Sequence, residues 1–438
     1  MALAITTIKP KPQAPEEIMI MNDISRRKFL KTLGLSLGAT ALPISFAKAA
    51  LRPRVIVVGG GFAGATAAKY LRLWSNNTVD VTLVEPNAVY YSPILSNLVL
   101  SGQKQLSQLG FKYDTLAQKY GITVTRSTVN SINSANRTVK LANGKTLGYE
   151  RLILAPGIQF KAIPGLDETK ILHAWQSGNQ VQQLRQQIQA IPNSGTYVLS
   201  IPKAPYRCPP GPYERACVIA DYLKRNKLGA KVIVLDGNPD ITVERDTFNA
   251  AFTSTYAGIV EYVPNTILQS VDSAKKVAIT SFGDYRADVL NVIPPHQAGG
   301  IVLNSGLANS STGDWANVNP LSYESTAVKG IHIIGDSQGT GQPKAGHIAN
   351  AEAKVCADAV LRLLSGSQPF AAPMTNSACY SPISATTASW LTAAFAYDPA
   401  SQTMQLVPAS YGASSGASTS NYRKMFEWAN SLFGDTFA

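Results

Sequence analysis

A glycine-rich turn between a short apolar strand and a helical pattern constrains the fold more than any other feature. Residues 54–58 read Arg-Val-Ile-Val-Val, and residues 59–64 follow as Gly-Gly-Gly-Phe-Ala-Gly before a helical pattern. In this dinucleotide-binding fingerprint Gly59 makes the tight turn, Gly61 lets the backbone approach a pyrophosphate, and Gly64 packs helix against strand. A second strand, residues 79–84, ends in Glu85, whose carboxylate can accept from a ribose hydroxyl. The sequence therefore predicts a dinucleotide-binding α/β domain.

Two later segments return to the same pattern. Residues 149–157 form a strand that ends in Ala155, Pro156 and Gly157, and residues 330–336 form another that closes on Gly335 and Asp336. This pair, on either side of a long insertion, resembles the two-dinucleotide-domain flavoprotein disulfide reductase superfamily. The resemblance implies bound FAD, a first segment that brings the chain back to the FAD domain, and contact of Asp336 with the ribityl and phosphate groups.

The insertion, about residues 161–290, is where that superfamily places its NAD(P)H domain. Its first two strands are predicted at residues 196–201 and 231–236. The first runs into Pro202-Lys203-Ala204-Pro205, which lacks a glycine fingerprint. Proline has no amide donor and little backbone freedom, so this turn cannot cradle a pyrophosphate in the usual way. We expect the nicotinamide site to be replaced and the electrons to come from another donor.

Cys208 lies in the loop that takes the place of that site. Arg207 precedes it, prolines follow it, and Glu214 stands six positions on. Positive charge favours a thiolate, and a nearby carboxylate can transfer protons, so the segment is typical of a redox thiol. The alternative is a buried, inert cysteine on a proline-rich connector.

Several motifs resemble the flavoprotein subunit of flavocytochrome c sulfide dehydrogenase. They are residues 207–216, 292–295, 343–346, 378–381 and 435–437. The resemblance implies that Cys208 and Cys379 pair as a redox disulfide, that Glu214 is their acid/base, and that Trp428 lies between the flavin and a haem partner. It also implies that Lys344 lies near the pyrimidine end of the flavin, the alternative being an ordinary surface lysine. Cys217 and Cys356 have no family counterpart and are expected to be buried helix residues.

The chain departs from that family in the loop after the second strand. Members often carry there a cysteine bonded to the flavin ring, and this sequence has Pro93 in its place. Proline offers no nucleophile, so we expect non-covalent FAD.

The first 49 residues are expected to be a cleaved twin-arginine export signal. Residues 25–31 read Ser-Arg-Arg-Lys-Phe-Leu-Lys, an apolar stretch follows, and Ala47-Lys48-Ala49 offers a small-x-small cleavage site near Ala49. The stretch is short of the roughly 20 apolar residues of a membrane span, so we expect no span and a periplasmic protein. Removing seven Lys/Arg and three Asp/Glu leaves +12 − 4 = +8 on the mature chain. No run of five basic residues occurs, which argues against a nucleic-acid partner.

The four cysteines show no CxxC or CxxCH spacing, and the four histidines are scattered, so neither a metal site nor a covalent haem is expected. The predicted fold class is α/β: two Rossmann-like three-layer domains, an FAD domain with an inserted degenerate NAD-like domain, and a C-terminal α+β interface domain. The predicted segments are 1–49 (signal), 50–160 and 291–365 (FAD domain), 161–290 (inserted domain) and 366–438 (interface domain).

Taken together, these features predict a periplasmic enzyme that oxidises sulfide through Cys208, Cys379 and FAD and passes electrons to a c-type cytochrome, either a separate subunit or a soluble protein. One alternative is a sulfide:quinone oxidoreductase, for which the apolar positions of residues 425–433 would form a membrane-inserting helix. A second alternative is a non-catalytic flavin-binding or assembly protein.

Overall fold

The computed structural model describes residues 52–438. In it, the glycine-rich turn follows an inner strand of a seven-stranded sheet. The export signal expected in residues 1–49 lies outside the described residues. Strand β1 (Arg54–Val58) pairs in parallel with β2 (Asp80–Val84) and with β9 (Arg151–Leu154), and β9 pairs in parallel with β21 (Ile331–Ile333). The other strands of this sheet are β5 (Thr123–Thr125), β19 (Val318–Asn319) and β20 (Glu324–Ser325). Parallel strands put their carboxyl ends at one edge, where the turn after β1 lies.

Two helices begin beside that edge and pack against each other. They are α2 (Phe62–Trp74) and α9 (Gly346–Leu364). Alanines are frequent on their buried faces, such as Ala67 on α2 and Ala353 on α9, so the helices can approach closely. A Cβ atom at Gly346 would lie 2.8 Å from the ring of Phe62. Residues almost three hundred positions apart therefore meet at one place.

A second parallel sheet occupies the insertion. Its order is β13 (Val260–Val263), β12 (Lys231–Asp236), β11 (Thr196–Ile201) and β17 (Val289–Val292). Strands β11 and β12 coincide with the two strands predicted from the sequence. Helix α6 (Gly211–Asn226) follows β11 and packs on β12, as a crossover helix does. The turn that lacks the glycine fingerprint therefore leads directly to the first turn of α6.

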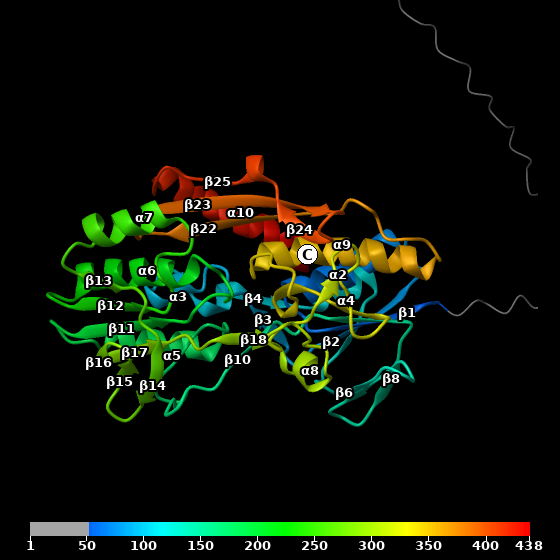
Figure 1. Cartoon of the computed structure of the whole chain (residues 1–438), viewed down its shortest axis with the longest axis horizontal. Coiled ribbons are helices and arrows are strands. Elements are labelled where there is room, and N and C mark those ends of the chain that lie inside the picture. The colour runs from blue at the N-terminus through cyan, green and yellow to red at the C-terminus, as the bar shows by residue number, and fades with distance from the viewer. Residues whose placement is uncertain (1–51) are drawn as a thin grey trace, which may run out of the picture. The chain divides into compact units, whose positions relative to one another are not determined.

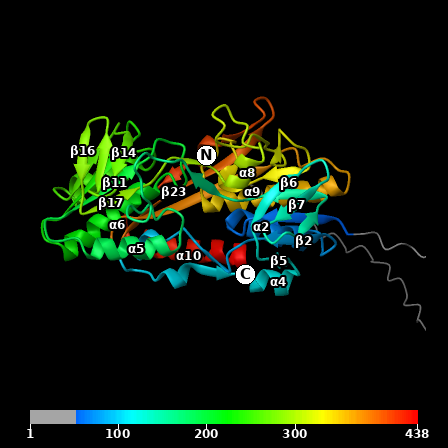
Figure 2. The ribbon, with the colours of Figure 1, turned by 90° about the horizontal axis from the view of Figure 1, so that it is seen from below.

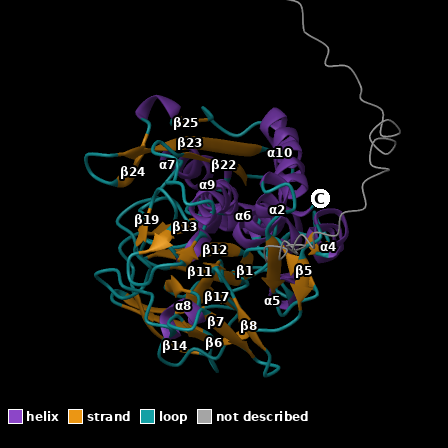
Figure 3. Cartoon of the chain, turned by 90° about the vertical axis from the view of Figure 1, so that its right-hand side faces the viewer, coloured by secondary structure: helices purple, strands orange, loops and turns teal. Residues whose placement is uncertain are grey.

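The C-terminal residues add an antiparallel sheet and a helix. The strands are β22 (Met374–Pro382), β23 (Ala388–Asp398), β24 (Thr403–Leu406) and β25 (Gly412–Ala413), and the helix is α10 (Thr419–Phe437). Strand β22 contacts both α6 and α9, and Figure 1 shows β22 and β23 passing above both helices. Figure 3 shows the helices as a layer between this sheet and the strands of the two parallel sheets.

Helix α10 packs its apolar face on the rest of the chain. Met425, Ala429, Leu432 and Phe433 are all buried. Figure 2 shows α10 beside α2, and Phe433 and Phe437 at its end stack on Phe111 and Phe62. Four of the apolar residues that could have formed a membrane-inserting face are therefore in the core, and Trp428 between them is partly buried.

Polar contacts fasten the end of α10 to α2 and α9. Asp435 accepts hydrogen bonds from Tyr70 (2.6 Å) and Asn350 (2.8 Å) and forms an ion pair with Lys354 at 2.8 Å. These groups are only partly exposed, so solvent screens their attraction less than it would at an open surface.

The remaining elements are short. The strands are β3 (Val89–Tyr91), β4 (Gly110–Lys112), β6 (Val129–Asn133), β7 (Thr138–Leu141), β8 (Thr146–Gly148), β10 (Ile158–Phe160), β14 (Leu268–Asp272), β15 (Val277–Thr280), β16 (Gly283–Arg286) and β18 (His296–Ala298). The helices are α3 (Asn97–Leu100), α4 (Asp114–Tyr120), α5 (Asn179–Gln189), α7 (Arg245–Ala250) and α8 (Gly300–Asn304).

The α/β fold class is confirmed. Residues Arg52–Ala438 form one compact unit, and the domain boundaries within it therefore stay predictions. None of the helices between residues 52 and 438 combines the length and the apolarity that crossing a membrane requires. The same residues hold no cluster of three His, Cys, Asp or Glu side chains that could bind a metal ion.

We predict that Phe437→Ala lowers the free energy of unfolding by about 3–5 kcal/mol, because it removes a buried ring and leaves a cavity. The matched control is Phe282→Ala, whose ring is 67% exposed and which should change stability by less than about 0.5 kcal/mol. Denaturant unfolding followed by circular dichroism measures both. Equal effects of the two substitutions would contradict the packing of α10.

Candidate functional site

A cavity of about 530 Å³ lies at the carboxyl edge of the seven-stranded sheet. Six of the residues predicted to bind the cofactor line it: Gly59, Gly61, Glu85, Ala155, Gly157 and Asp336. They come from the turns after β1, β2, β9 and β21. Ligands of open α/β sheets bind outside the carboxyl ends of the strands, so the cavity has the expected place for a dinucleotide.

The glycines shape this cavity by allowing close backbone approach. Gly59 has φ +98°, and a Cβ atom there would lie 2.3 Å from the carbonyl oxygen of Ala155. A Cβ atom at Gly64 would lie 1.8 Å from the carbonyl oxygen of Gly59, which explains why α2 can begin so close to β1. Gly64 thus packs the helix rather than lining the cavity.

Two carboxyl groups face this cavity. Glu85 accepts from the Gly60 amide at 2.8 Å and from the amide and side chain of Asn87, which fixes its orientation. Asp336 has one carboxyl oxygen, Oδ1, that is buried and has no hydrogen-bond partner within residues 52–438. Burial raises the pKa of Asp336, against the nearby positive charges of Arg207 and Lys344. A buried polar atom of this kind needs a partner, and a hydroxyl-rich ligand chain would supply one, so the residues fit FAD.

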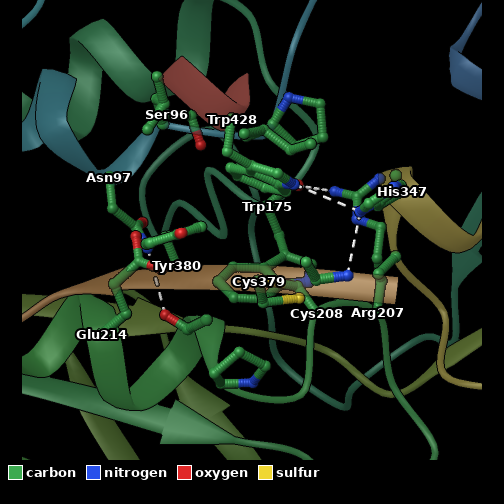
Figure 4. Close-up of a pocket in the computed structure, with 18 residues that line it drawn as sticks. Ser96, Asn97, Trp175, Arg207, Cys208, Glu214, His347, Cys379, Tyr380 and Trp428 are labelled. Carbon is green, nitrogen blue, oxygen red and sulfur yellow. Dashed lines mark hydrogen bonds between the residues drawn. The ribbon is translucent and has the colours of Figure 1, made fainter. Parts of the chain in front are cut away.

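A second, smaller cavity of about 70 Å³ lies next to the first. Cys208, Glu214, Cys379 and Trp428 line it, as Figure 4 shows. The two cavities share three lining residues: Pro93, Arg207 and Gly346. The structure therefore brings the three predicted catalytic residues together beside the cofactor cavity, from the loop before α6, from α6 and from β22, and Trp428 of α10 lies with them.

Cys208 has an unusual backbone conformation just before α6. Its φ is +61°, in the left-handed region that non-glycine residues rarely adopt. Its amide donates to the carbonyl of Lys344 at 2.7 Å, and its carbonyl accepts from Gly211 at 2.9 Å. These bonds hold the strained conformation, and such strain clusters at functional sites.

Both cysteines are free thiols in the structure, and burial makes them reluctant to ionise. Burial, then the charge of Cys379 and that of Glu214, raise the pKa of Cys208 well above its usual value, against Arg207. Burial and then the charge of Glu244 raise the pKa of Cys379 to about 12. Arg207 lowers the pKa of Cys208, as expected, but desolvation of the thiolate outweighs this one cation.

Glu214 lies in the first turn of α6 and is buried. Its Oε1 accepts from the side-chain amide of Asn97 at 2.9 Å, and the Asn97 oxygen accepts from Arg215 at 2.9 Å. Burial raises the pKa of Glu214 to about 8, although Asn97 and Arg215 lower it. Glu214 is therefore an acid that still carries its proton at neutral pH.

The two arginines that flank this segment have different surroundings. Arg207 lines both cavities and donates to the carbonyl of Trp175. Arg215 is fully buried and donates to Asn97, Asn291 and the carbonyls of His173 and Ala174. Only Arg207 is placed to meet an anion in the cavity.

Lys344 is buried rather than a surface lysine. Its ammonium group donates to the carbonyl of Gln338 at 2.6 Å and lies 3.7 Å from the centre of the Trp315 ring. Burial lowers its pKa to about 8, against the charges of Asp336 and Glu352. It lines neither cavity, so its predicted position near the flavin stays a prediction.

Trp428 is held by His347, a residue that the sequence analysis did not single out as a site residue. The Trp428 indole (3.3 Å) and the Ala378 amide (3.0 Å) both donate to Nδ1 of His347. Because Nδ1 accepts twice, the proton of the neutral ring is on Nε2. Asn97 was also missed, and no local sequence signal marks either residue.

In the second sheet, side chains of the protein itself occupy the carboxylate that would bind the ribose of a nucleotide. Asp236, at the end of β12, accepts from the hydroxyls of Tyr213 and Tyr262, each at 2.8 Å. In a dinucleotide-binding domain the carboxylate after the second strand binds ribose. Here two tyrosines occupy it, which agrees with the missing glycines after β11.

Two family models match the chain. The model described as the central part of the sulfide dehydrogenase (flavocytochrome c) flavoprotein chain matches residues 181–294. The model described as pyridine nucleotide-disulphide oxidoreductase matches residues 53–194. The two matches overlap at residues 181–194 and together cover residues 53–294, the part of the chain from β1 to β17.

Individual relatives agree with these models. The sulfide dehydrogenase (flavocytochrome c) flavoprotein chain of Chlorobaculum thiosulfatiphilum is 52% identical over 46 residues, which are 10% of this chain and 94% of that sequence. The mitochondrial sulfide:quinone oxidoreductase of Dictyostelium discoideum is 22% identical over 309 residues, 65% of each protein. The chain thus spans slightly less than two thirds of that relative's length.

Among solved structures, the sulfide:quinone oxidoreductase of Aquifex aeolicus matches with a TM-score of 0.73 and 15% identity, over 88% of this chain and 92% of that one. At this identity the match shows the fold alone. Together with the family models and the Chlorobaculum relative, it shows a protein that binds FAD. The chain therefore belongs to the disulfide oxidoreductase superfamily of flavoproteins and, within it, to the family of flavocytochrome c sulfide dehydrogenase flavoprotein chains.

Proposed function

We propose that this protein oxidises sulfide through a redox pair of Cys208 and Cys379 and passes the electrons through FAD to a c-type cytochrome in the periplasm. One observation carries the proposal: both cysteines line a small cavity that shares Pro93, Arg207 and Gly346 with the cofactor cavity. A substrate at the cysteines would then lie next to the cofactor. The relatives named for sulfide oxidation support the same choice of substrate.

FAD would be held by the residues that line the larger cavity, with Asp336 and Glu85 as acceptors for its hydroxyl groups. When bound, FAD supplies a two-electron acceptor that can release electrons one at a time. The chain positions the cofactor and closes the nicotinamide route, because Asp236 is bound by Tyr213 and Tyr262.

The protein's own residues would carry out thiol–disulfide exchange. Hydrosulfide attacks one sulfur of a Cys208–Cys379 disulfide; the bond between the two cysteines breaks, a bond to the incoming sulfur forms, and the other cysteine leaves as a thiolate. Arg207 attracts the anionic sulfur into the cavity. Glu214, neutral below a pH of about 8, can exchange a proton with the sulfur of Cys208 when that sulfur is a thiolate, because desolvation has raised the pKa of Cys208 as well.

A cytochrome is favoured over quinone as the electron acceptor. Trp428 lines the cysteine cavity and is partly exposed on α10, so it joins the cavity to the surface. The mature chain carries a net charge of +8 from the count above, which suits an acidic partner. The sulfide:quinone alternative requires α10 to enter a membrane, whereas most of its apolar residues, such as Met425, Leu432 and Phe433, are packed in the core. The twin-arginine signal supports the periplasmic location.

Changing Cys208 or Cys379 to Ser should abolish bleaching of the flavin by sulfide while the protein stays yellow, because neither residue lines the larger cavity. Stopped-flow absorbance measures the bleaching. Cys356→Ala is the matched control: this cysteine is buried in α9, away from the cavity, and the variant should bleach at the wild-type rate. Wild-type bleaching by Cys379→Ser would refute the redox pair, and a wild-type protein that sulfide never bleaches would favour the non-catalytic alternative.

Acid precipitation should release all the flavin into the supernatant, since Pro93 has no nucleophile for a covalent bond. The flavin remaining on the precipitated polypeptide, measured by its absorbance after washing, should be negligible. Flavin that stays with the polypeptide would show a covalent link at another residue.

Trp428→Ala should slow reduction of cytochrome c more than reduction of the flavin by sulfide, and Trp428→Phe, which keeps an aromatic ring on Tyr380, should slow it less. Wild-type cytochrome reduction should be faster at 0.01 M than at 0.1 M salt, because the Debye length falls from about 30 Å to about 10 Å. Reduction of a soluble quinone analogue that added cytochrome does not improve, with binding to liposomes, would instead support the quinone alternative.

A further inference from the structure

A second buried carboxyl group lies behind the cysteines and has no part in the mechanism above. Glu244 precedes α7 and is only 7% exposed. Its Oε2 accepts from the hydroxyl of Ser381 at 2.9 Å, and its Oε1 is buried with no hydrogen-bond partner within residues 52–438. An ionised carboxylate would leave that oxygen uncompensated, whereas a neutral acid tolerates such a site better.

The register of β22 brings this group close to Cys379. Side chains two residues apart leave the same face of a strand, so Cys379 and Ser381 point to the same side of β22. Ser381 is in contact with Glu244, which therefore lies on the face of the strand that carries the thiol. After burial, the charge of Glu244 is the largest cause of the raised pKa of Cys379.

The other groups around Glu244 leave it without a neutralising cation. From α6 it is faced by Glu214 and Cys217, whose pKa values its charge raises, and from β22 and β23 by the hydroxyls of Ser381 and Ser389. Arg245, its neighbour in the chain, is exposed and pairs with Asp240. Burial raises the pKa of Glu244, against the two serine hydroxyls.

The backbone at Glu244 is strained as well. Its φ is +50° and its ψ +37°, a left-handed conformation for a residue that is not glycine. Such strain is held only where the surrounding structure fixes it and clusters at functional sites. Cys208 is another non-glycine residue with a positive φ.

We propose that Glu244 is the acid/base partner of Cys379, and that it exchanges a proton with the sulfur of Cys379 while Glu214 serves the Cys208 side. The inference rests on the proposed function. Hydrosulfide attacks the Cys208 sulfur of the disulfide, the Cys208–Cys379 bond breaks, a Cys208–S–SH group forms, and Cys379 leaves with the bonding electron pair. Glu244 gives its proton to this thiolate and becomes a carboxylate; the proton returns to Glu244 when Cys379 next ionises.

The test uses the reduced full-length protein, with iodoacetamide alkylation of each cysteine followed over pH by peptide mass spectrometry. Glu244→Gln should lower the pKa of Cys379 by about one unit, a tenfold gain in thiolate at a given pH, because the opposing carboxylate is gone. Cys208, which Glu214 faces, should be unchanged. The same variant should reduce its flavin with sulfide about a hundredfold more slowly, because a proton donor is lost.

A thiol that becomes more reactive in an enzyme that becomes slower is a result that a purely structural role would not give. Glu261→Gln, which removes an exposed carboxylate on β13, is the control for net charge and should match the wild type in both assays. Unchanged alkylation of Cys379 and an unchanged rate in Glu244→Gln would overturn the proposal. If Glu244→Gln fails to retain FAD, Ser381→Ala is measured instead, because it removes the hydroxyl that holds the Glu244 carboxyl group. A wild-type rate of flavin reduction by sulfide in Ser381→Ala would also overturn the proposal.

The two assays separate this inference from the proposed function. If sulfide does not bleach the wild-type flavin, the proposed function fails, yet the shift in Cys379 alkylation still reports the effect of the Glu244 charge on Cys379. If sulfide bleaches both proteins equally, the proposed function stands and the role of Glu244 is refuted.

Discussion

The packing of α6 against β22 is the contact on which the site depends. Cys208 lies just before α6, Glu214 is in its first turn, Cys379 belongs to β22, and this contact brings them to one cavity. It is possible because the turn after β11 no longer binds a nucleotide. The start of α6, which would face a pyrophosphate in an ordinary reductase, presents a thiol and a carboxyl group instead. Asn97 of α3 bonds both Glu214 and Arg215 and so holds α6 against the FAD-binding part of the chain.

Desolvation sets the chemistry of the groups that this packing encloses. Burial is the largest cause of the raised pKa values of Cys208, Cys379, Glu214 and Glu244. At neutral pH both thiols and Glu214 therefore rest in their uncharged forms. A disulfide avoids the charge altogether, since neither sulfur has to ionise in the oxidised state. Arriving hydrosulfide brings one negative charge, which Arg207 can offset, and the proton donors limit the charge that exchange leaves behind.

Much of this fold could be predicted from the sequence, because the signals are local. The strands at residues 54–58, 196–201 and 231–236 are short apolar runs, and the turn after the first needs glycine where the backbone meets Ala155. The pairing of distant segments is different. Cys379 could be connected with Cys208 only through family resemblance, because the two cysteines are 171 positions apart in the sequence. Asn97, His347 and Glu244 carry no local signal, since their roles arise from contacts between elements. The sequence shows the cation Arg207 beside Cys208, but it does not show the desolvation that opposes its effect on the thiol pKa.

The central claim is that Cys208 and Cys379 form a redox pair, and a thiol map of the purified oxidised protein tests it most directly. Denaturation in iodoacetamide without reductant, followed by peptide mass spectrometry, should alkylate Cys217 and Cys356 and yield the Cys208 and Cys379 peptides joined by a disulfide. Anaerobic treatment with sulfide before alkylation should separate those two peptides. The account would be contradicted if all four cysteines were fully alkylated without reductant in a protein preparation in which sulfide still bleaches the flavin.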